Sequence, residues 1–221
     1  MNLPSRSVLD RELNDLENQL AALGSLVEAA IEEAMAALAE RNVSRAQQVI
    51  RNDEQINVQR YKLEEDCLRI LATQQPKATD LRTVLATLHI AIELERMGDH
   101  AAGIAALVER MEEDPDIDSL HKLPKMTRRA TKMVHEALSG YLNRDMAVME
   151  KLVKRDEKLD RQYVQFFQQM VVEMRAEDDF IRQGTFLLWV AHNLERIGDR
   201  ATNIAERVIF MHTGAYPESV I

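Results

Sequence analysis

The chain of 221 residues is poor in the residues that interrupt regular structure, with 7 glycines, 5 prolines and aromatic residues at only 5%. So few glycines and prolines cannot supply the turns of a sandwich or barrel, nor the loops of an alternating α/β fold. Alanine, leucine, glutamate, arginine and methionine, which favour helices, are abundant instead. The composition therefore predicts an all-α protein.

Cysteine and long apolar runs are also scarce, and acidic residues outnumber basic ones by 37 to 28. The single Cys67 excludes an internal disulfide framework and fits a reducing compartment. No apolar run approaches the roughly 18 residues that cross a bilayer, and residues 1–10 lack the apolar segment of a signal peptide. The net charge of -9 argues against a broad surface for nucleic acid. We therefore expect a cytoplasmic protein without membrane insertion or a nucleic-acid partner.

The sequence contains an internal repeat at an offset of about one hundred residues. Residues 94–105 (LERMGDHAAGIA) and 194–205 (LERIGDRATNIA) are identical at eight of twelve positions, and residues 51–57 match 154–160. Two colinear matches at nearly the same offset indicate a duplicated unit. We expect two units, residues 1–114 and 115–221, joined at the acidic, proline-containing segment 112–118.

Each unit is predicted to be a bundle of three long helices. Turn signals are few and the connectors short, so successive helices should lie antiparallel. The six expected helices are 8–40, 44–73, 77–111, 119–142, 146–176 and 178–213. Apolar residues at heptad spacing support this arrangement in the third and sixth helices: Ile90, Leu94, Met97, Ala101, Ile104 and Val108, and Val190, Leu194, Ile197, Ala201, Ile204 and Val208.

The repeated segments each carry two acids one helical turn apart, Glu95 with Asp99 and Glu195 with Asp199. At this i, i+4 spacing the two carboxylates share one face of the helix and repel each other. A cation between them would reverse the sign of the interaction. The alternative is that these faces are simply solvated surface, as acid-rich helix faces usually are.

The preceding helix of each unit has oxygen-bearing side chains that reach the same level. The turns are at Pro76 and Glu177. These side chains precede the turn by nearly the same number of residues as the paired acids follow it, so both sets lie at the same height on adjacent antiparallel helices. Four oxygen-bearing side chains would meet once per bundle, in an open site on the bundle surface that suits Mg, Mn or Fe. The candidate ligands are Asp53, Asn57, Glu95 and Asp99 in the first unit, and Asp156, Asp160, Glu195 and Asp199 in the second.

Other residues near these acids have simpler interpretations. Gly98 and Gly198 lie between the paired acids, where close approach of a neighbouring helix or of an ion would explain a mid-helix glycine. We expect Arg96 and Arg196 to pair with local acids. His192 has Ile92 as its counterpart and is at most an accessory to the second site.

These motifs resemble the PhoU family, the phosphate-specific transport system accessory proteins, over nearly the whole chain. The resemblance rests on residues 53–57 (DEQIN), on residues 75–82 (QPKATDLR) and on the twin LERMGD and LERIGD segments. It implies two three-helix bundles with multinuclear metal clusters held by paired E/D-x-x-x-D motifs at the positions above. Iron is the first candidate ion, with Zn, Mn or Mg as others. Asn57 departs from the pattern because it replaces a carboxylate.

The resemblance also implies a role that is not enzymatic. Such proteins are negative regulators of phosphate uptake and of the phosphate-starvation response. Their partners are the ATPase subunit of the phosphate ABC transporter and a sensor histidine kinase, and homodimers are common among them.

Two alternatives remain from other classes. A ferritin-like di-metal oxidase needs Glu-x-x-His on two helices, and the sequence contains only the reversed order at His192 and Glu195. A purely structural helical repeat protein explains the heptads but not the repeated acids.

Overall fold

The protein is helical throughout the part described by the computed structural model, which covers residues 6–112, 114, 120–153 and 156–215. These residues contain no strand, which confirms the all-α prediction. The elements are α1 (Arg6–Glu40), α2 (Val43–Gln74), α3 (Thr79–Arg110), α4 (Leu123–Asn143), α5 (Met146–Val153), α6 (Asp156–Ala176), the 3-10 turn η1 (Asp178–Phe180) and α7 (Ile181–Thr213). None of the described helices is long and apolar enough to cross a membrane.

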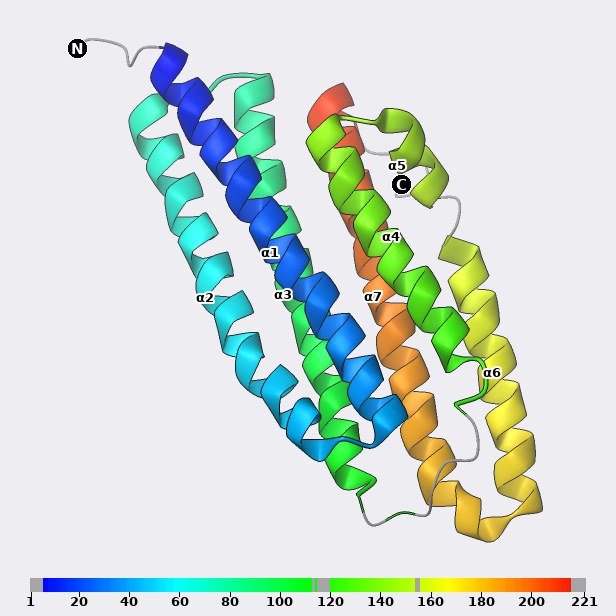
Figure 1. Cartoon of the computed structure of the whole chain (residues 1–221). Coiled ribbons are helices and arrows are strands. Elements are labelled where there is room, and N and C mark those ends of the chain that lie inside the picture. Colours follow the sequence, from blue (N-terminus) through cyan, green and yellow to red (C-terminus); the bar gives the residue numbers. More distant parts are fainter. Residues whose placement is uncertain (1–5, 113, 115–119, 154–155, 216–221) are drawn as a thin grey trace.

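The helices form two three-helix bundles that lie against each other (Figure 1). The first consists of α1, α2 and α3, and the second is built on α4, α6 and α7 with α5 added. Helices α3 and α7 run antiparallel at the centre, and α1 also contacts α4. The expected boundary between residues 114 and 115 adjoins residues 115–119, which lie outside the described part, so its position stays a prediction.

The helix expected over residues 146–176 is described as two segments, α5 and α6, with Lys154 and Arg155 outside the described residues. Helix α5 is inclined differently from α6 (Figure 1) and packs on α4 and α7. Its Met149 and Leu152 are fully buried. Met149 packs directly over Gly140 of α4, at a position that a side chain there would fill. Burial of these two apolar side chains explains why α5 follows its own direction.

The core follows the predicted heptad positions. All twelve apolar residues singled out in the third and sixth helices are buried in α3 and α7. The turns also lie where the sequence places them: Asn42 caps α2 by accepting a hydrogen bond from the backbone N–H of Arg45 (3.0 Å). Gln75 ends the same helix in the left-handed conformation, with φ of 49°. The fold is therefore a central antiparallel pair, with α1 and α2 packed on α3 and with α4, α5 and α6 packed on α7.

Two equivalent arginines connect the bundles at opposite ends of the central pair. At the start of α3, Arg82 donates from Nε to the carbonyl of Met211, near the end of α7 (3.0 Å). At the start of α7, Arg182 donates from Nη2 to the carbonyl of Arg110, the last residue of α3 (2.9 Å), and pairs with Asp114 (3.1 Å). The last carbonyls of a helix have no partner within it, so each bundle supplies a cap for the other.

Candidate metal centre

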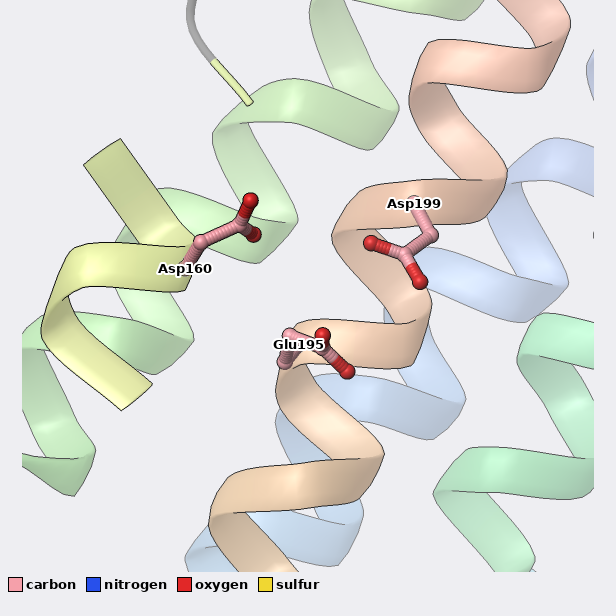
Figure 2. Close-up of side chains that lie close together, drawn as sticks. All are labelled: Asp160, Glu195 and Asp199. Carbon is pink, nitrogen blue, oxygen red and sulfur yellow. The ribbon is translucent and has the colours of Figure 1, made fainter. Parts of the chain in front are cut away.

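Three carboxylates of the second bundle converge on one point. Asp160 of α6 faces Glu195 and Asp199 of α7 (Figure 2). Each offers an oxygen, and the three oxygens all lie within 4.8 Å of one another. Glu195 and Asp199 share a face because they are one helical turn apart. Asp160 reaches them because α6 and α7 are adjacent antiparallel helices, as the counting of heights predicts.

The mid-helix glycines explain how the helices come so close at this level. A Cβ atom on Gly198 would lie 2.3 Å from Leu159 Cδ2, and one on Gly98 would lie 2.9 Å from Ile56 Cδ1. Real carbon atoms do not approach this closely. Of the two explanations considered for these glycines, close helix packing therefore accounts for both.

Burial and mutual repulsion make the charged form of this cluster costly. Burial raises the pKa of Asp199, the charge of Asp160 raises it further, and Arg196 opposes both. Burial likewise raises the pKa of Asp160, against the attraction of Arg161. Arg196 does pair with a local acid, since its Nη1 lies 2.9 Å from Asp199 Oδ2. A cation placed among the three oxygens would remove the repulsion.

An aromatic pair lies beside the cluster. His192 Nδ1 is 3.5 Å from Glu195 Oε2, and the His192 ring lies 5.9 Å from the ring of Tyr163. Burial raises the pKa of Tyr163, and the charge of Glu195 adds to the effect. Tyr163 belongs to none of the repeated motifs, although its position three residues after Asp160 puts both on one face of α6. His192 is half exposed, which fits an accessory position.

The first bundle brings its candidates together less tightly. Asn57 donates from Nδ2 to Asp53 Oδ2 (3.3 Å), so its NH2 group contacts one oxygen of that carboxylate. Burial raises the pKa of Asp53, and the charge of Asp99 raises it further. Burial and the charge of Asp99 also raise the pKa of Glu95, while Arg60 and Arg96 lower it. These shifts place Asp53, Glu95 and Asp99 within each other's electrostatic reach.

The two bundles nevertheless differ at the level of ligand distances. Among the described residues, the first-bundle carboxylates form no group of three within 4.8 Å. Asp53 Oδ1 is buried there without a hydrogen-bond partner in the described part of the chain, which is costly for a carboxylate oxygen. The backbone of Asp156 begins α6, and its side chain lies outside the described residues. Its expected role as a ligand stays a prediction.

The second bundle fits a hard or borderline divalent cation. Carboxylate oxygens suit Mg and Mn, and they also ligate Fe and Zn at distances of about 2.0–2.2 Å. Oxygens up to 4.8 Å apart can both approach one ion at that distance after small side-chain adjustments. Glu195 and Asp199 are 20% and 27% exposed, so water can reach the remaining coordination positions. The arrangement is an open cluster of three carboxylates at the surface that could hold one cation.

Comparisons with known proteins match most of the chain. The PhoU domain family matches twice, at residues 20–108 and 123–208. A relative from Clostridium acetobutylicum, a phosphate-specific transport system accessory protein PhoU homolog, is 32% identical over 95% of this chain and 96% of its own. A homolog of the same description from Pseudomonas aeruginosa is 35% identical over 92% of this chain and 84% of its own.

Solved structures agree with these sequence matches. The crystal structure of PhoU from Pseudomonas aeruginosa superimposes with a TM-score of 0.89 at 34% identity, covering 93% of this chain and 99% of that one. The phosphate transport system regulatory protein PhoU from Streptococcus pneumoniae gives 0.88 at 30% identity, covering 95% and 99%. The family consists of regulatory accessory proteins and not of enzymes, which removes the oxidase alternative. With two copies of the domain, two matching bundles and relatives aligned from end to end, this chain belongs to the PhoU family.

Proposed function

We propose that this protein is a metal-dependent regulatory adaptor of phosphate uptake. It acts in the cytoplasm as a negative regulator of uptake and of the phosphate-starvation response. The convergence of Asp160, Glu195 and Asp199 on one point, within a fold whose relatives are named for phosphate-specific transport, is the observation that carries the proposal. No step of it requires chemistry on a substrate.

The metal acts by changing the charge and rigidity of one face of the bundle. Three carboxylates without an ion repel one another and hold a local negative charge. A divalent ion neutralises most of that charge and connects α6 to α7 through their side chains. The protein then offers a different surface to its partners, the ATPase subunit of the phosphate ABC transporter and a sensor histidine kinase. A homodimer would present two such faces. Iron is the first candidate ion, and Mn, Zn or Mg are the others.

Metal content of the purified protein tests the site directly. Protein purified without chelator should contain metal, and the double variant Glu195→Ala, Asp199→Ala should lose the part held by the second bundle. Glu206→Ala, on the same helix outside the cluster, is the matched control and should keep the wild-type content. Unchanged metal in the double variant would refute the assignment of the site.

The regulatory role is tested separately, by capture of partners from cells grown with ample phosphate, with metal quantified in the same sample. Recovery of the transporter ATPase or the kinase by wild-type protein, and its loss with the double variant, would support a metal-dependent adaptor. Equal recovery by both proteins would refute the dependence on metal. Failure to recover either partner would refute the adaptor role itself.

A further inference from the structure

Helix α4 carries a local excess of positive charge. The chain as a whole carries 37 acidic residues against 28 lysines and arginines. Helix α4 reverses this balance, with four cations, Lys125, Arg128, Arg129 and Lys132, and the single carboxylate Glu136. Such a concentration of positive charge creates a local attraction for anions that the rest of the acidic surface opposes.

A cavity of about 260 Å³ opens between α4 and α6 beside this helix, lined by Arg129, Lys132, Met133, Glu136 and Lys158. Three of the five lining residues are cations. The cavity is smaller than the roughly 300–1000 Å³ of pockets that hold drug-sized molecules. Its dimensions and charge therefore suit a small anion.

The walls of the cavity are held in place by contacts between the two helices. Arg129 Nη1 donates to the backbone carbonyl of Lys158 (2.9 Å), which fixes the guanidinium at the border between α4 and α6. Met133 is nearly fully buried and reaches toward Gly198 of α7, as does Leu159, the neighbour of Lys158. The floor of the cavity is thus part of the packed core. A preformed site loses less conformational entropy on binding than a flexible one.

The cations of the cavity keep most of their binding capacity. A guanidinium has five N–H donors, and the contact with the Lys158 carbonyl uses one of them. Lys132 lies 3.7 Å from Glu136, an exposed i, i+4 pair of small value. Among the described residues, no carboxylate lies within ion-pairing distance of Arg129 or Lys158. A bound anion would meet one guanidinium and two ammonium groups.

We propose that this cavity between α4 and α6 binds a small oxyanion of the phosphate class. A tetrahedral oxyanion with more than one negative charge presents oxygens in several directions to the three cations, whereas a monocarboxylate offers one charge and two coplanar oxygens. The site is separate from the carboxylate cluster, and its existence does not depend on metal binding there.

The test is a calorimetric titration of inorganic phosphate into the full-length, metal-stripped protein at constant ionic strength. Lys158→Gln should weaken binding by about tenfold, because it removes one charge-assisted contact. The substitution keeps the backbone carbonyl that Arg129 uses, so the walls of the cavity remain. Lys125→Gln, on α4 but outside the cavity, makes the same change of net charge and should leave the affinity unchanged.

Three results would overturn the proposal. One is the absence of saturable binding up to about 10 mM phosphate, where the free energy of binding is below roughly 3 kcal/mol. Another is equal weakening by Lys158→Gln and Lys125→Gln, which would mean a general effect of net charge. The third is binding that appears only after Mn loading and is insensitive to Lys158→Gln, because phosphate would then be a ligand of the metal. The first two results do not bear on whether Asp160, Glu195 and Asp199 hold an ion.

A parallel titration with glycerol 3-phosphate distinguishes free phosphate from the phosphoryl end of a larger molecule. Affinity equal to that of phosphate supports a site open to phosphate monoesters. Much weaker binding supports a site for the free ion. Both results are consistent with an oxyanion site in the cavity. Thermal unfolding of each variant confirms that the protein is folded.

Discussion

Neutralising one carboxylate of the second-bundle cluster should stabilise the protein without metal and weaken it with metal. Glu195→Gln is the sharpest perturbation, because it keeps the shape of a side chain that is 20% exposed. Its charge faces two others, on Asp160 and Asp199, at oxygen distances within 4.8 Å. The same charge that destabilises the metal-free fold is the one that would attract a cation. Whether Glu195→Gln raises or lowers the stability of the protein therefore depends on whether metal is present.

The magnitude follows from the distances. Two unit charges 4.8 Å apart repel by about 0.9 kcal/mol at the dielectric constant of water and by about 3.5 kcal/mol at an effective value of 20. Partial exposure puts the cluster near the lower limit, so relief of two repulsions should raise the free energy of unfolding by about 1–2 kcal/mol. For a chain of this length that is a rise in Tm of roughly 2–8 °C.

Metal should reverse which protein is the more stable, the wild type or Glu195→Gln. An ion present at one hundred times its dissociation constant stabilises the wild type by about 2.7 kcal/mol. A variant that binds one hundredfold more weakly would gain only about 0.4 kcal/mol under the same conditions. Wild-type protein should thus be the less stable of the two without metal and the more stable with it.

Thermal unfolding of wild-type and Glu195→Gln protein, each with and without Mn in one buffer, measures all four stabilities. Glu206→Gln is the matched control: the residue lies on the same helix outside the cluster, and burial raises its pKa too. It should leave the metal-induced shift in Tm unchanged. A Glu195→Gln protein that is less stable than wild type without metal, or that gains as much from Mn, would refute the reasoning.

Two further predictions concern packing and pH. Gly198→Ala should lower the free energy of unfolding by about 1 kcal/mol, because overpacking against Leu159 at 2.3 Å outweighs the gain in helix propensity. Gly103→Ala, where the nearest atom is 3.4 Å away, should instead stabilise by about 0.5–1 kcal/mol in the same urea titration. Without metal, wild-type protein should lose stability relative to Asp160→Asn as pH rises from about 4, because the raised pKa values of Asp160 and Asp199 let the folded state hold protons longer. A flat difference between the two proteins across pH would contradict this.

The sequence predicted the parts of the fold that repeat and the parts that bury apolar surface. Spacing of apolar residues identified the central helices, and the repeated acids identified the helix levels at which Asp160 meets Glu195 and Asp199. The division between α5 and α6 was not predictable, because no glycine or proline marks it. It follows from the packing of Met149 and Leu152 on other helices, which depends on tertiary contacts.

The directions in which side chains point were also not predictable from the sequence. Counting residues gives the height of Asn57 on its helix, but not that its amide donates to Asp53. Arg82 and Arg182 occupy equivalent positions one hundred residues apart in the sequence, yet only the ends of the neighbouring helices reveal what they bind. Periodicity defines faces and levels, whereas hydrogen-bond partners depend on where distant segments end.

The exchange of caps between the bundles has the symmetry of an isologous homodimer. Arg82 of one half binds the end of the other half's central helix, and Arg182 returns the same contact, as in a two-fold interface between identical subunits. Fusion of the two copies into one chain makes that association intramolecular, so it no longer depends on protein concentration. Once joined, the copies are free to diverge. Only one of them now groups three carboxylates within 4.8 Å among the described residues, while the shared interface keeps both halves folded.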